Sequence, residues 1–228
     1  MTSALAARTA WHLPGLADEA AAALAALEAA LCLEQAPHGL DEWDERPLQR
    51  ALATALRRTH EVALEAYYPS TAGRKLSHRP RCDLVLSRRG WPLHQGESLP
   101  LDLCPPQDAL WLELKVAHQL RAGGARDGRY GEQWRRHLIA DLRKLADEPL
   151  IRDAALVLVA FTEDEATLHR DLDTFEVLLG RHGVVAGFRQ VRALTIVERI
   201  GHRVCGVAVW PVVPRGERPA ATGEVTGS

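Results

Sequence analysis

The sequence predicts an α/β domain in which helices flank a central mixed sheet. Segments with apolar residues at helical spacing alternate with short apolar segments that are typical of strands. A length of 228 residues suits one such domain, and 46% hydrophobic with 25% charged residues is typical of a globular protein. The longest apolar stretches are well short of the roughly 20 residues that cross a bilayer, so we expect no membrane helix.

Two helices are expected before the first strand. Residues 16–35 are rich in alanine and carry leucines at helical spacing, and a proline and a glycine follow them. The second helix begins near Asp41 or Asp44 and runs to about Arg58. We therefore expect residues 1–40 to form a helical extension that precedes the main domain.

Strands are expected next, separated by a long loop. Residues 61–68 alternate between apolar and polar side chains, and residues 81–87 and 109–117 are short apolar segments. The loop at residues 91–108 is rich in proline and glycine and has the composition of an insertion between strands.

The rest of the chain predicts two more helices and three more strands. The helices are expected at residues 130–145 and 164–182, and the strands at residues 154–161, 188–198 and 203–213. The main domain then spans residues 41–213. The tail at residues 214–228 has little apolar content and is expected to be disordered.

The strand at residues 109–117 carries two charged side chains in an apolar setting. Glu113 and Lys115 are two positions apart, so they lie on the same face of a strand. An ionised carboxylate and an ammonium are costly to bury unless they are paired or bind a metal. Asp83 lies in the preceding apolar strand. If the two strands pair, Asp83 and Glu113 converge on one divalent cation, and carboxylate oxygens suit Mg²⁺ or Mn²⁺.

This arrangement resembles the PD-(D/E)XK nuclease superfamily, whose members have the restriction-endonuclease-like fold. The resemblance is carried by Asp83 in Arg-Cys-Asp-Leu-Val-Leu and by Glu113 with Lys115 in Trp-Leu-Glu-Leu-Lys. The order of elements over residues 41–161 is also similar: a helix, three strands, a helix and a strand. One departure is Cys82, which stands where the motif has a proline.

The resemblance implies metal-dependent hydrolysis of a phosphodiester bond. The two acids of the strands would bind Mg²⁺ or Mn²⁺, and Lys115 would stabilise developing negative charge or orient the attacking water. Many family members carry a glutamate on the first helix that faces the metal. Glu45 is the best match and would complete the metal ligands, with Glu42 and Glu65 as rivals.

Basic residues beside the motif predict contacts with nucleic acid. The formal net charge of −2 argues against binding by bulk electrostatics, so contact must come from local clusters. Arg79 and Arg81 belong to such a cluster, and clustered cations beside a metal site fit the phosphate backbone. A solvated loop in an arginine-rich chain fits the same pattern.

The helix expected at residues 130–145 contributes two further candidates. Family members exist in which this helix borders the active site, so Tyr130 and Gln133 are expected to contact the scissile phosphate. Asp141 and Lys144, three positions apart, are expected to form a surface ion pair.

Other kinds of chemistry have no support in the sequence. The four cysteines form no C-x-x-C pair and are expected to be buried or neutral thiols. No histidine has the H-x-x-x-H or H-E-x-x-H spacing of a zinc site, and no phosphate-binding G-x-x-x-x-G-K-[ST] loop is present. The charge order at the N-terminus is not that of a secretory signal, so we expect a cytoplasmic protein.

The resemblance thus implies a metal-dependent deoxyribonuclease of restriction, phage defence or repair. Its partner is DNA, and it would act as a single chain, as a homodimer or with protein partner subunits. One alternative is a non-catalytic or partner-dependent subunit with the same fold inside a larger nucleic-acid-processing complex. A small-molecule or nucleotide hydrolase remains a third possibility.

Overall fold

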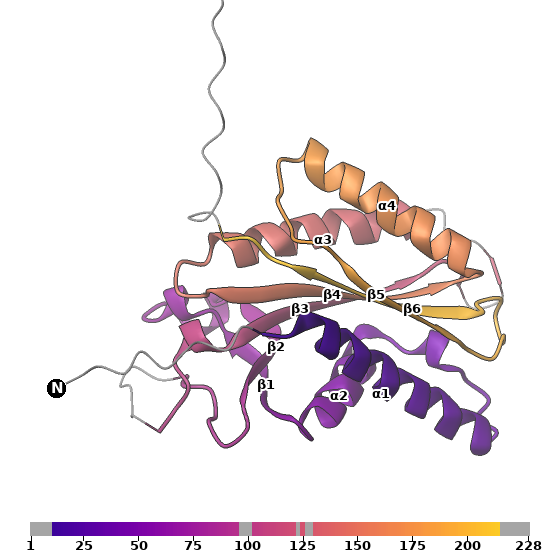
Figure 1. Cartoon of the computed structure of the whole chain (residues 1–228), viewed down its shortest axis with the longest axis horizontal. Helices are drawn as coiled ribbons and strands as arrows, with labels where there is room; N and C mark the ends of the chain where they lie inside the picture. Colours follow the sequence, from indigo (N-terminus) through magenta and orange to yellow (C-terminus); the bar gives the residue numbers. More distant parts are fainter. Residues whose placement is uncertain (1–10, 96–101, 122–123, 126–129, 215–228) are drawn as a thin grey trace, which may run out of the picture.

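The computed structural model describes residues 11–95, 102–121, 124–125 and 130–214, and shows helices on both faces of one sheet (Figure 1). The side chains of residues 132 and 133 are outside this description, as is the predicted disordered tail apart from Pro214. The α-helices are α1 (Leu13–Leu33), α2 (Glu45–Leu56), α3 (Tyr130–Asp147) and α4 (Glu165–Arg181). The strands are β1 (His60–Tyr67), β2 (Arg81–Arg88), β3 (Leu110–His118), β4 (Asp153–Thr162), β5 (Gln190–Thr195) and β6 (Val204–Pro211).

The six strands form one mixed sheet in the order β1-β2-β3-β4-β6-β5. The first three strands are antiparallel neighbours, whereas β3 and β4 are parallel and are connected through α3. Strands β5 and β6 continue the sheet beyond β4 in antiparallel pairing. A parallel pair needs a crossover connection, and α3 provides it. The predicted α/β class, its mixed sheet and the C-terminal strand pair are confirmed.

The two faces of the sheet are covered by different helix pairs. Figure 1 shows α3 and α4 on one side and α1 and α2 on the other. Alternate residues of the central strands therefore pack into two separate hydrophobic clusters, with Leu156 and Leu158 of β4 facing α3 and α4, and Val157 and Val159 facing α1 and α2. The helix α1 packs against α2, β5 and β6, and its Leu24 is fully buried.

In β1 and β2, the alternation of side chains between the two faces of the sheet is interrupted at one position each. In β1, Leu64 packs into the cluster of α1 and α2, yet Ala66 packs into the opposite cluster. The pairing of β1 with β2 omits the position between them, where Glu65 stands opposite Asp83 and has a positive φ of 53°. A positive φ is uncommon outside glycine and costs about 1–3 kcal/mol. This interruption lies next to the predicted catalytic acid.

A buried histidine ties the segment before α2 to the C-terminal strand pair. His202 accepts a hydrogen bond at Nε2 from the backbone N–H of Leu120, at 2.9 Å, so its proton is on Nδ1. Nδ1 then donates to Asp41 Oδ2 at 2.9 Å, and both side chains are fully buried. This tie holds the segment before α2 against the loop that follows β3. Glu45 is the first residue of α2, and Lys115 lies on β3, so the tie helps to place both.

Each expected helix and strand is present, with ends within a few residues of the expected ones. Within the described residues, no helix is long and apolar enough to cross a membrane. The four cysteines are free thiols, and three of them are buried.

The burial of α1 gives a test of its share in stability. We expect Leu24→Ala to lower the free energy of unfolding by about 2–5 kcal/mol, because it leaves a cavity between α1 and the sheet. Leu33→Ala, on the same helix but at a side chain that is 86% exposed, should change it by less than about 0.5 kcal/mol. Urea denaturation of both variants measures the difference, and equal effects would contradict the packing described for α1.

Candidate functional site

The candidate site lies where β2 and β3 diverge. These strands pair over three positions only, and the last pair on this side joins Leu84 to Leu112. The next residues along the two strands are Asp83 and Glu113. Asp83 Oδ2 accepts a hydrogen bond of 2.7 Å from the backbone N–H of Leu114, a donor that an uninterrupted ladder would pair with β2. The two predicted acids thus stand side by side at the end of the ladder.

Lys115 joins three carboxylates that come from different elements. Its Nζ is 3.3 Å from Glu45 Oε1 on α2, 3.6 Å from Asp141 Oδ2 on α3 and 3.9 Å from Asp83 Oδ2 on β2. It also donates to the carbonyl of Leu114 at 2.8 Å. Because α2 and α3 lie on opposite faces of the sheet, this one ammonium connects both helical layers. Burial alone would lower the pKa of Lys115, but the surrounding carboxylates, led by Asp83, raise it.

Glu113 is 2% exposed, and two donors hold one of its oxygens. The hydroxyl of Tyr68 and the ammonium of Lys144 both contact Oε1, each at 2.5 Å. Tyr68 is itself buried, stacks on Trp111 and has Lys144 Nζ 4.8 Å from its ring centroid. Burial, together with the nearby charge of Asp83, nevertheless raises the pKa of Glu113 to about 8.

The expected ion pair between Asp141 and Lys144 is present, but it belongs to the site and is not a surface pair. Their atoms are 3.7 Å apart, but Asp141 also contacts Lys115, and Lys144 also contacts Glu113. The face of α3 that carries them is turned toward the sheet. Asp141 therefore links the two lysines of the site, Lys115 and Lys144. Lys144 keeps its charge, because Glu113 raises its pKa although burial opposes this.

Gln49 supports the interruption between β1 and β2. It lies on α2, is buried, and donates from Nε2 to the carbonyl of Asp83 at 2.8 Å and to Glu65 Oε1 at 3.1 Å. A single amide therefore fixes the backbone of Asp83 and the side chain opposite it. The sequence offered no signal for this residue or for Tyr68, because both stand in ordinary positions at the end of a strand or on a helix.

The structure separates Glu45 from its two rivals. Glu45 is the first residue of α2 and contacts Lys115. Glu42 instead accepts from the backbone N–H of Gly39 and pairs with His38, and Glu65 is exposed and contacts Gln49.

The first turn of α3 borders the cluster. Tyr130 lines a cavity of about 310 Å³ together with Glu45, Lys115 and Trp134. The hydroxyl oxygen of Tyr130 is itself buried, so its expected contact with substrate stays a prediction. Gln133 belongs to the same helix, but its side chain lies outside the described residues.

The donor atoms suit a divalent cation, although the described residues are not arranged as a metal site. No group of three or more His, Cys, Asp or Glu side chains among them could hold a metal ion as they stand. The carboxylates instead surround lysines. With every carboxylate ionised, as metal binding would require, four carboxylates and two ammonium groups leave a formal charge of −2, which one divalent cation balances; these residues are Glu45, Asp83, Glu113, Asp141, Lys115 and Lys144. Hard oxygen donors of this kind fit Mg²⁺ or Mn²⁺.

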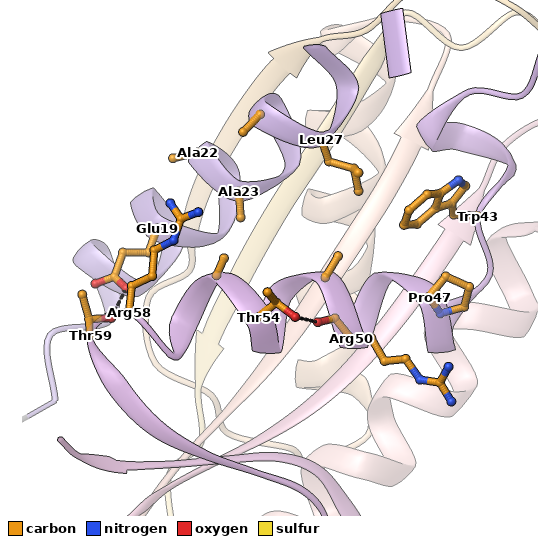
Figure 2. Close-up of a pocket in the computed structure, with 13 residues that line it drawn as sticks. Glu19, Ala22, Ala23, Leu27, Trp43, Pro47, Arg50, Thr54, Arg58 and Thr59 are labelled. Carbon is orange, nitrogen blue, oxygen red and sulfur yellow. Dashed lines mark hydrogen bonds between the residues drawn. The ribbon is translucent and has the colours of Figure 1, made fainter. Parts of the chain in front are cut away.

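A larger hollow lies elsewhere, between α1 and α2 (Figure 2). This groove has a volume of about 730 Å³ and is lined mainly by alanine side chains with Leu27, Trp43 and Pro47. Its charged side chains are Glu19, Arg50 and Arg58, and Glu19 accepts a hydrogen bond from Thr59. The groove has none of the clustered acids and lysines of the strand ends, so it is not the candidate active site.

Comparisons of the chain with family models, with curated proteins and with solved structures found no match.

The raised pKa of Glu113 predicts how stability depends on pH. The unfolded chain loses this proton near the ordinary pKa of 4.5, whereas the folded protein keeps it up to a pKa of about 8. Folding therefore takes up a proton in this window, so Glu113 makes the protein less stable as the pH rises from about 5 to 8. We expect Glu113→Gln, which cannot titrate, to remove this contribution.

Urea denaturation of the intact protein and of Glu113→Gln at several pH values measures the effect. As the pH rises from about 5 to 8, the intact protein should lose stability relative to Glu113→Gln, so the free energy of unfolding of the variant minus that of the intact protein should increase. A difference that stays constant over the window would contradict the assigned protonation of Glu113.

Proposed function

We propose that the protein is a metal-dependent nuclease that hydrolyses DNA phosphodiester bonds. One observation carries the proposal: Lys115 lies within 4 Å of carboxylates from α2, β2 and α3, beside the buried Glu113. Several charged groups that are costly to bury are thus gathered at one place, next to a cavity. A structural ion pair needs only two partners, whereas metal-assisted phosphoryl chemistry uses several acids and a cation together.

The arrangement of elements supports the same proposal. The order α2, β1, β2, β3, α3, β4 is similar to that of the restriction-endonuclease-like fold, and Asp83 and Glu113 stand on neighbouring strands as in the PD-(D/E)XK motif. We therefore propose that the domain has this fold. The N-terminal α1 and the C-terminal β5 and β6 are additions around that core.

The residues of the site would divide the work as follows. Asp83, Glu113 and Glu45 would hold the Mg²⁺ or Mn²⁺ ion, which when bound polarises a phosphoryl oxygen and lowers the pKa of a water. Metal binding would require these carboxylates to exchange their lysine contacts for the cation. Lys115 remains protonated because the carboxylates raise its pKa, so it serves to stabilise negative charge on the reacting phosphate and not as a general base.

Cleavage assays test this proposal. We expect the purified protein to cleave DNA with Mg²⁺ or Mn²⁺ and to be inactive in EDTA, with circular, linear and single-stranded DNA as substrates. Asp83→Ala and Lys115→Ala should each lower the rate by at least about 100-fold, because they remove a metal ligand and a charge-stabilising group. Asp173→Ala, at an exposed position of α4, is the matched control and should cleave as the intact protein does.

The outcomes separate the two candidate functions. Cleavage that survives in both variants would contradict the assigned site. A folded intact protein that cleaves none of these substrates with either metal would contradict the enzymatic proposal and favour the partner-dependent or non-catalytic subunit.

A further inference from the structure

The connection between β1 and β2 is cationic and begins and ends at the candidate site. No Asp or Glu occurs between Glu65 and Asp83, although the segment contains Arg74, Lys75, Arg79 and Arg81. Tyr68, at its start, donates to Glu113, and Asp83 follows two residues after its last arginine. The connection that carries these cations is therefore bounded at both ends by residues of the site.

Two of these arginines are organised around one aromatic ring. The guanidinium carbons of Arg79 and Arg81 are 4.5 and 4.8 Å from the ring centroid of Tyr67, close enough for cation–π contacts. Arg81 also donates to the Tyr67 hydroxyl at 2.8 Å, and Arg79 donates from Nε to Thr71 Oγ1 at 3.3 Å. These contacts restrict both side chains before any partner binds, which lowers the entropy cost of binding.

Among the residues that the structure describes, the positive charge of the connection is not neutralised by ion pairs. Within the described residues, none of the four is paired with a carboxylate. Five arginines elsewhere are paired with carboxylates: Arg135 with Asp171, Arg189 with Asp173, Arg192 with Asp18, Arg199 with Glu28 and Arg203 with Glu198. Other described arginines, such as Arg50 and Arg57, also lack such a pair; Arg79 and Arg81 combine the lack of a carboxylate with contacts to Tyr67 that hold them in place. Guanidinium groups that are held in place without an acid are suited to bind phosphate groups.

An exposed leucine lies among these cations. Leu76 is 63% exposed and is the first residue of the short helical turn Leu76–His78, which lies between Lys75 and Arg79. An apolar side chain flanked by cations is the combination with which many proteins contact the sugars and base edges of a DNA groove.

We propose that residues 74–81 form the surface that binds the substrate duplex, with Arg79 and Arg81 on its phosphate backbone and Leu76 in contact with the groove. The inference rests on the proposed nuclease function, because it takes DNA as the partner. It assigns substrate binding to one connection that continues directly into the site.

Fluorescence anisotropy with a labelled DNA duplex tests the surface without requiring cleavage, with Ca²⁺ in place of Mg²⁺. We expect Arg79→Gln/Arg81→Gln to weaken binding by about 10- to 100-fold near 0.1 M salt. The slope of log K against log salt should fall by about 2, since each phosphate contact contributes about 0.9. Leu76→Ala should weaken binding by about fivefold and leave this slope unchanged, because it removes no charge. The control Arg181→Gln, at the exposed end of α4, should bind as the intact protein does.

The results distinguish this surface from the nuclease proposal. If the double variant binds the duplex with unchanged affinity and slope, the surface is wrong, even if the protein cleaves DNA. If it shows the expected losses, the surface is supported, even if the intact protein fails to cleave. Preference for an RNA duplex, or no binding to DNA by the intact protein, would overturn the inference.

Discussion

The arrangement of helices around the sheet is tied to two charged side chains that are placed within an apolar strand. Glu113 and Lys115 stand on β3, a central strand that is otherwise built from apolar residues. Such charges are tolerated only when partners compensate them, and the partners come from both helical layers and from the neighbouring strand. The charged residues of β3 therefore depend on α2 and α3, which bring Glu45, Asp141 and Lys144 to them. Lys144 and Tyr68 compensate Glu113, and the three remaining carboxylates compensate Lys115.

Interruptions in the pairing of β1 with β2 and of β2 with β3 make this clustering possible. A regular ladder would pair Asp83 and Glu113 through the backbone. Side chains two positions apart would then stay on the same face of the sheet along the whole of each strand. Here the ladder ends, Asp83 takes the backbone donor of Leu114 with its side chain, and Gln49 holds the carbonyl of Asp83. The positive φ of Glu65 is the conformational cost of this arrangement.

The elements and the strand acids were predictable from the sequence, because apolar periodicity and charges within an apolar strand are local signals. Asp141 and Lys144 were misplaced because spacing along a helix does not say which way the helix is rotated against a sheet. Tyr68 and Gln49 carry no local signal at all, since their roles arise from contacts between residues distant in sequence. His202 stands in a predicted turn, and only the folded chain shows that it is buried beside Asp41. The catalytic roles and the metal remain predictions.

The tie between Asp41 and His202 has a consequence for the architecture. The two residues are 161 positions apart, and they join the segment before α2 to the turn between β5 and β6. A fragment cut after β4 would keep every candidate catalytic residue. It would nevertheless leave the carboxylate of Asp41 without its donor, the N–H of Leu120 without its acceptor and one edge of β4 unpaired. The residues of the candidate site therefore do not form a separable module in this chain, because the segment that carries Glu45 is held by a hairpin far along the sequence.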